Sequence, residues 1–118
     1  MNPVVHLELH TGDLAAARST YSRLCGWDSE QLCGRSGEYT SLGLGEQIGG
    51  GVVECPTTRA LWLPYVRVED LCDALARAQR LGARVLLGPR EGEAGWRAVI
   101  STAAGGELAL WQPKEWSS

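Results

Sequence analysis

The sequence predicts an α+β fold made of two βαβββ modules, and three observations support this prediction. The chain aligns with itself when Val4 is placed on Leu61, an offset of 57 residues. Each copy opens with a β-like stretch that leads into a stretch of helical periodicity. Short apolar runs separated by glycines then follow in both copies, as expected for consecutive strands joined by turns.

The first strand is predicted from "VVHLELHTGDL" (4–14), which aligns with "LWLPYVRVEDL" (61–71) in the second copy. Apolar residues of the first stretch occupy every second position, and the positions between them hold His6, Glu8 and His10. This period of two is typical of a strand with one face against a core and the other toward water or a ligand.

A helix is predicted after each first strand. Asp13 and Asp70 are suited to the start of a helix, where free N–H groups and the positive dipole end favour a carboxylate. Apolar residues then recur at helical spacing on one face: Leu14, Ala17, Tyr21 and Leu24, and in the second copy Leu71, Ala74, Leu75, Ala78 and Leu81. Gly26 and Gly82 follow, at the position where a left-handed residue ends a helix.

The remaining strands are predicted from "EQLC", "EYTSLGL" and "GGGVVEC" in the first half and from "ARVLL", "WRAVIS" and "ELALWQ" in the second. The prediction is one domain, residues 1–118, with module one about 1–57 and module two about 58–118. We expect curved mixed sheets that carry the helices on their outer face and line a cleft with the other face. Leu63, Tyr65 and Arg67 would then share the cleft with the polar residues of the first strand.

Composition narrows the classes of partner. A formal charge of -3 with no basic run argues against nucleic acid and anionic membranes as partners. No signal-peptide pattern and no apolar stretch of membrane-spanning length occur, so a cytoplasmic location is expected. The four cysteines include no C-x-x-C pair, which predicts reduced, mostly buried thiols.

The sequence resembles the glyoxalase, bleomycin resistance and extradiol dioxygenase superfamily, also called the vicinal oxygen chelate superfamily. The resemblance is carried by "HLELHTGDLAAARSTYSRLCGW", "LWLPYVRVEDLCDALARAQRLGARVL" and "GGELALWQP", which cover both halves. "ELHTGD", "CGW", "IGGGVV", "LPYVRVEDL" and "LALWQP" are similar to its hydroxylase-like or antigen-like subgroup. The resemblance implies a homodimer, in which modules of two chains complete each cleft.

Metal-dependent members of this superfamily place one ligand on the first and one on the last strand of each module. The resemblance assigns these positions to His6 and Glu54 in module one, both suitable donors for a divalent metal. In module two it assigns them to Leu63 and Leu110, which cannot coordinate a cation. The metal set is therefore incomplete, and no resident cofactor is expected; a divalent metal on His6 and Glu54 is the alternative.

The favoured prediction is a protein that binds a small, partly aromatic molecule in a cleft formed by His6, Glu8, His10, Glu54, Tyr65, Arg67 and Trp96. The sequence has five tryptophans and no phenylalanine. Trp96, at the start of a strand, is a candidate for the pocket wall or for core packing, and Trp27 and Trp62 are expected in the core. Glu8 is expected to neutralise the neighbouring imidazoles and Arg67.

Two enzymatic alternatives remain open, and the sequence assigns no catalytic residue to either. One is a metal-dependent lyase, isomerase or dioxygenase that uses His6 and Glu54. The other is a metal-free acid–base enzyme with His6 or His10 as the base and Arg67 beside an anionic intermediate.

Overall fold

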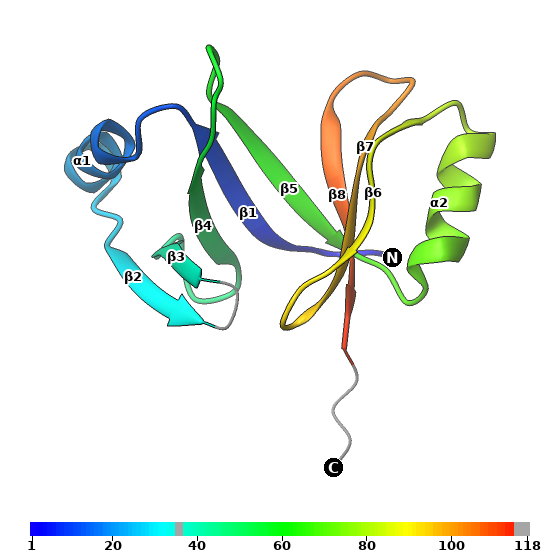
Figure 1. Ribbon diagram of the computed structural model, residues 1–118, viewed down its shortest axis with the longest axis horizontal. Helices are drawn as coiled ribbons and strands as arrows, with labels where there is room; N and C mark the ends of the chain where they lie inside the picture. The colour runs from blue at the N-terminus through cyan, green and yellow to red at the C-terminus, as the bar shows by residue number, and fades with distance from the viewer. Residues whose placement is uncertain (35–36, 115–118) are drawn as a thin grey trace. The chain divides into compact units, whose positions relative to one another are not determined.

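The computed structural model describes residues 1–34 and 37–114 and divides into two compact units (Figure 1). We call residues 5–63 the N-terminal module, and residues 64–118 together with residues 1–4 the C-terminal module. The first four residues join the second unit, where the backbone N–H of Arg67 donates to the carbonyl oxygen of Pro3. Trp116 lies outside the described residues.

Each module has the predicted βαβββ order, so the chain is α+β. The first five elements are β1 (Val4–Thr11), α1 (Leu14–Cys25), β2 (Ser29–Gly34), β3 (Gly37–Leu42) and β4 (Gly49–Glu54). The second five are β5 (Leu61–Arg67), α2 (Leu71–Arg80), β6 (Arg84–Glu91), β7 (Gly95–Ser101) and β8 (Glu107–Pro113). All the strands predicted from the glycine-punctuated runs are present.

The strands of the N-terminal module are ordered β2-β3-β4-β1, with β1 parallel to β4 and the other pairs antiparallel. The register places Leu9 beside Val52. Both side chains are buried, and they pack with Ala17 of α1 and Leu42 of β3. This core lies on the face of the sheet that carries the apolar residues of β1, as the alternation in the sequence predicts.

The C-terminal module repeats this arrangement with the order β5-β8-β7-β6, in which β5 is parallel to β8. Helix α2 covers one face of these strands (Figure 1). The buried residues on that side are Val68, Leu71, Ala74, Leu75, Ala98, Ile100 and Leu110. Strand β6 lies at the end of this order and contains Pro89, which edge strands tolerate because they have unpaired N–H positions.

The helix ends follow the local chemistry of the sequence. The side chains of Asp13 and Asp70 each accept a hydrogen bond from the backbone N–H three residues later, at 3.0 and 2.9 Å. Gly26 ends α1 with φ 72°, and Gly82 follows α2 with φ 89°. Both angles lie in the left-handed region that glycine adopts without a side-chain clash.

Two expectations about burial were wrong. Leu24 in the last turn of α1 is 76% exposed, and Leu81, which directly follows α2, is 79% exposed. Cys25, Cys33 and Cys72 are exposed, and Cys55 is half-buried. Cys25 is the last residue of α1, Cys33 lies on the edge strand β2, and Cys72 is the second residue of α2. Helical or strand spacing alone did not reveal the exposure of these three thiols.

The expectation for Trp27 and Trp62 is confirmed. Both pack against the N-terminal core together with Tyr21, and the Tyr21 and Trp27 rings are stacked with centroids 5.6 Å apart. Among the described residues, no helix has the length and apolar character needed to span a membrane.

Replacing Asp70 with alanine should lower the free energy of unfolding by about 1 kcal/mol, because the N–H of Asp73 loses its acceptor at the start of α2. Chemical denaturation measures the change. Asp28→Ala, at an exposed site outside the helices, is the control. Equal stabilities for the two variants would contradict the assigned cap.

Candidate functional site

The face of the N-terminal sheet opposite its helix carries a hydrogen-bonded acid–imidazole cluster on β1. Glu8 is buried, with 7% of its surface exposed. Its Oε1 lies 2.7 Å from Nε2 of His10, and its Oε2 lies 3.7 Å from Nε2 of His6. In the tautomer that carries its proton on Nε2, His10 donates this hydrogen bond to the Glu8 carboxylate. The structure thus brings together the three polar residues predicted from the alternation of β1.

Tyr39 of β3 joins this cluster, which we call the polar cluster (His6, Glu8, His10 and Tyr39). Its hydroxyl lies 3.4 Å from Nε2 of His6 and donates to the carbonyl oxygen of Gly50 at 3.3 Å. Burial, and then the negative charge of Glu8, raises the pKa of Tyr39 to about 12. The phenol is therefore neutral and remains a hydrogen-bond donor at physiological pH.

Two glycines of β4 make room for the polar cluster. A Cβ atom on Gly49 would lie 2.8 Å from Nδ1 of His6. A Cβ atom on Gly51 would overlap the hydroxyl of Tyr39. The glycine run "GGG" therefore lets a phenol and an imidazole lie directly against the backbone of β4, which a side chain would prevent.

The structure does not bring Glu54 to His6. In the parallel pair of β1 and β4, Glu54 is the register partner of Thr11, while His6 is the partner of Gly49. Side chains alternate along a strand, so Glu54 lies on the face that carries α1. Its Oε2 accepts a hydrogen bond from the backbone N–H of Leu14 at 2.7 Å, at the start of that helix.

In the C-terminal module, too, a side chain of the last strand accepts a hydrogen bond from the first residue of the helix. The backbone N–H of Leu71, the first residue of α2, donates to Oε1 of Gln112 on β8 at 2.8 Å. Leu110, the position that the repeat matches to Glu54, belongs to the buried cluster under α2. The assignment of Glu54 and Leu110 to ligand positions on the cleft face was therefore wrong for the same reason: both last strands present these residues to the helix.

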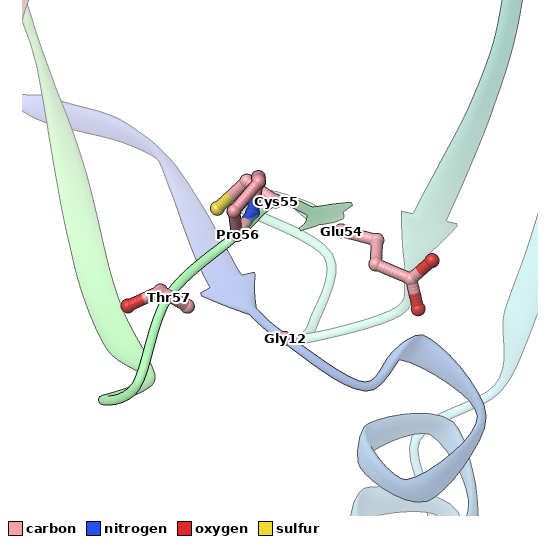
Figure 2. Close-up of a pocket in the computed structure, with 5 residues that line it drawn as sticks. All are labelled: Gly12, Glu54, Cys55, Pro56 and Thr57. Atoms are coloured by element: carbon pink, nitrogen blue, oxygen red, sulfur yellow. The ribbon is translucent and has the colours of Figure 1, made fainter.

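A shallow pocket lies beside Glu54, lined by Gly12, Glu54, Cys55, Pro56 and Thr57 (Figure 2). Its polar side chains already have partners within the protein. Glu54 holds the first N–H of α1, and the hydroxyl of Thr57 donates to the carbonyl oxygen of Arg59 at 2.7 Å. The two polar side chains that line this pocket therefore hold groups of the chain itself.

The residues of the N-terminal module do not fit the metal set implied by the superfamily resemblance. Glu54 is hydrogen-bonded to a helix terminus, and Glu8 is engaged by His10. Within residues 1–34 and 37–114, no group of three His, Cys, Asp or Glu side chains is arranged to hold a metal ion. A catalytic zinc commonly has three protein ligands, which this donor set does not assemble.

The predicted site residues of the C-terminal module lie on two different faces of its sheet. Tyr65 is buried, and its hydroxyl accepts a hydrogen bond from Nη1 of Arg97 at 3.1 Å. Arg67, two residues further along β5, is exposed. Trp96 instead packs against the buried cluster under α2, with Nζ of Lys114 5.5 Å from its ring. Of the two roles considered for Trp96, its packing corresponds to the core.

Sequence reasoning missed Tyr39 and Arg97. Tyr39 lies 33 positions from His6 in the sequence, and its strand has no clear alternation that would orient it. Three consecutive glycines within a predicted strand were a usable signal, because glycines in a strand often mark a close approach by another group. Arg97 lies in "WRAVIS", where only the register with β8 reveals which residues share its face.

No established protein-family profile matches this chain. Two curated relatives, both named "Putative glyoxylase CFP32" and found in Mycobacterium bovis and Mycobacterium tuberculosis, are each 25% identical over 114 residues. The alignment covers 90% of this chain but 44% of either relative. The chain thus spans less than half the length of the curated relatives that it matches.

Solved structures with a similar fold include methylmalonyl-CoA epimerases. The enzyme from Mycobacterium tuberculosis gives a TM-score of 0.66 at 18% identity, covering 95% of this chain and 88% of its own. A variant of the Streptomyces coelicolor enzyme in complex with 2-nitronate-propionyl-CoA gives 0.64 at 15% identity, with coverages of 95% and 97%. At these identities the likeness concerns the fold.

Replacing Gly51 with alanine should lower the free energy of unfolding by about 1–3 kcal/mol, because the new methyl group meets the Tyr39 hydroxyl. Gly88→Ala is the matched control, since a Cβ atom there meets nothing within 4 Å. Chemical denaturation of both variants measures the difference. If Gly51→Ala is as stable as Gly88→Ala, Tyr39 does not lie against β4.

The raised pKa of Tyr39 predicts an alkaline loss of stability. An unfolded tyrosine ionises near pH 10, whereas folded Tyr39 keeps its proton up to about pH 12. The folded state binds more protons in this interval, so stability should fall as the pH rises from about 10 to 12. Unfolding midpoints of wild type and Tyr39→Phe across this range test this, with Tyr21→Phe as control. The prediction fails if Tyr39→Phe loses stability as steeply as wild type.

Proposed function

For this chain, which has the fold of the glyoxalase, or vicinal oxygen chelate, superfamily, we propose that the polar cluster of the N-terminal module binds a small, partly aromatic molecule. The cluster would hold an oxygen-bearing group of the ligand, such as a carbonyl or hydroxyl. Imidazole and phenol groups suit this task because both can donate or accept hydrogen bonds.

The observation that carries the proposal is the buried position of Glu8 on a sheet face that its own helix does not cover. Removing a carboxylate from water costs free energy that its partners must offset. Asp13, Asp70 and Glu54 have a structural role, because each carboxylate accepts a hydrogen bond from a backbone N–H at the start of a helix. Glu8 instead contacts the imidazoles of His6 and His10, and such clusters of neighbouring titratable groups are typical of functional sites.

The polar cluster also remains reachable. The side chains of His6 and His10 keep 23% and 26% of their surface exposed, although the carboxylate between them is nearly covered. A ligand would thus meet two imidazole edges whose orientation is fixed by Glu8 and by the Tyr39 hydroxyl. Such pre-organisation reduces the entropy lost on binding, because the side chains are already ordered.

The same groups support a binding role more directly than a metal-dependent reaction. A lyase, isomerase or dioxygenase of that kind would need a ligand set that the described residues of the N-terminal module do not assemble around His6. A hydrogen-bonded imidazole–carboxylate pair, by contrast, can orient a polar ligand. It can also move a proton at His10 Nε2, which leaves metal-free acid–base chemistry as an extension of the binding role.

Acetophenone and catechol, uncharged probes with one and two oxygens, should bind to wild type in isothermal titration calorimetry. Tyr39→Phe should weaken binding about 3- to 10-fold, since a hydrogen bond is worth about 0.5–1.5 kcal/mol. His6→Ala should weaken it about tenfold or more, because both the contact and the orientation of Tyr39 are lost. Circular dichroism and unfolding curves verify that each variant is folded.

Tyr21→Phe is the matched control, because it removes a phenol hydroxyl on the helix side of the same module. Its affinity for both probes should equal that of wild type. The proposal is wrong if neither probe binds to wild type, or if His6→Ala and Tyr21→Phe bind them equally well.

A further inference from the structure

Three arginines and a tryptophan form one row across the four strands of the C-terminal module. Arg67 on β5 is the register partner of Trp111 on β8, which in turn is the partner of Arg97 on β7. Arg97 is then the partner of Arg90 on β6. Register partners point to the same face of a sheet, so these four side chains share one face. We call them the arginine row.

This face is the one opposite α2. The neighbouring positions Ala98 and Leu110 belong to the buried cluster under the helix, and side chains alternate along each strand. Tyr65, two residues before Arg67, confirms the assignment, because its ring lies 6.3 Å from that of Trp111 and its hydroxyl contacts Arg97. The arginine row therefore lies outside the apolar core of its module.

Placing Arg90 directly opposite Arg97 carries a cost. Like charges at facing positions of an antiparallel pair destabilise a sheet. Elsewhere in the module, Lys114 lies 2.9 Å from a carboxylate oxygen of Glu91, and Arg77 lies 3.9 Å from one of Asp73. Arg97 instead donates a hydrogen bond to the neutral hydroxyl of Tyr65. A bound anion between the two facing guanidinium groups would turn this repulsion into attraction.

The side chain of Arg97 is also pre-oriented for binding such an anion. It is half-buried, and its Nη1 donates to a tyrosine that is 6% exposed. This bond fixes one side of the planar guanidinium group, which has five N–H donors in total. The remaining donors keep the fork geometry that matches the two oxygens of a carboxylate or phosphate.

We propose that the arginine row binds the carboxylate or phosphate group of an anionic small molecule, with Trp111 against the flat apolar part of that molecule. Arg97 is the anchor, and Arg67 and Arg90 supply additional charge from either side of it. This site lies on the C-terminal module and goes beyond the function proposed for the polar cluster, on which it does not depend.

The test compares benzoate and phenyl phosphate with uncharged benzyl alcohol and with inorganic phosphate, by calorimetry on the full chain. Benzoate or phenyl phosphate should bind more tightly than benzyl alcohol, and the tighter of the two identifies the head group. Phenyl phosphate should also exceed inorganic phosphate if Trp111 contributes. Arg97→Gln should weaken binding about 10- to 100-fold, and Arg97→Lys should be intermediate because it keeps the charge but loses the fork.

Arg80→Gln, on the exposed side of α2, makes the same change in charge and should bind the anions as wild type does. Arg90→Gln provides a second readout that does not depend on the choice of probe. Without ligand it should raise the unfolding midpoint by about 2 °C, because the facing positive charge is gone. The proposal is overturned if benzoate and phenyl phosphate bind no better than benzyl alcohol, or if Arg97→Gln and Arg80→Gln bind them equally.

Discussion

The hydrogen bond between Glu8 and His10 is the interaction on which the account of the N-terminal module depends. Both residues lie on β1, where the intervening Leu9 is buried in the core beneath α1. Packing of Leu9 fixes the orientation of the strand, and the period of two then turns Glu8 and both imidazoles to the opposite face. A slip of one residue would place a carboxylate in the core, so one constraint sets both the core and the site.

The elements could be predicted from the sequence because each has a local cause. The first strand could be predicted from the alternation along β1, and the helices from the aspartates before them and the glycines after them. The internal repeat then predicted a second module with the same βαβββ order. Exposure of Leu24, Leu81 and the cysteines could not be predicted in this way. It depends on which neighbouring segments cover each side chain, and local periodicity does not determine that.

The candidate site was only half predictable. His6, Glu8 and His10 follow from β1 itself. The resemblance placed Glu54 on the same face as His6, and the run "GGGVVE" has no alternation that could have corrected its orientation. Tyr39 and Arg97 enter their sites through cross-strand register, which a single sequence does not reveal. The two modules also differ in character. The N-terminal module presents imidazoles around a buried carboxylate, and the C-terminal module presents guanidinium groups beside aromatic rings.

The central claim is that the polar face of β1 is a ligand site, and the two histidines of the chain offer a direct test of it. Heteronuclear NMR of the imidazole rings gives signals from His6 and His10 alone. On addition of an uncharged aromatic probe that binds the protein, both sets of ring signals should shift, and they should do so with the dissociation constant measured calorimetrically. A probe that binds while both imidazole signals stay unchanged would contradict the claim.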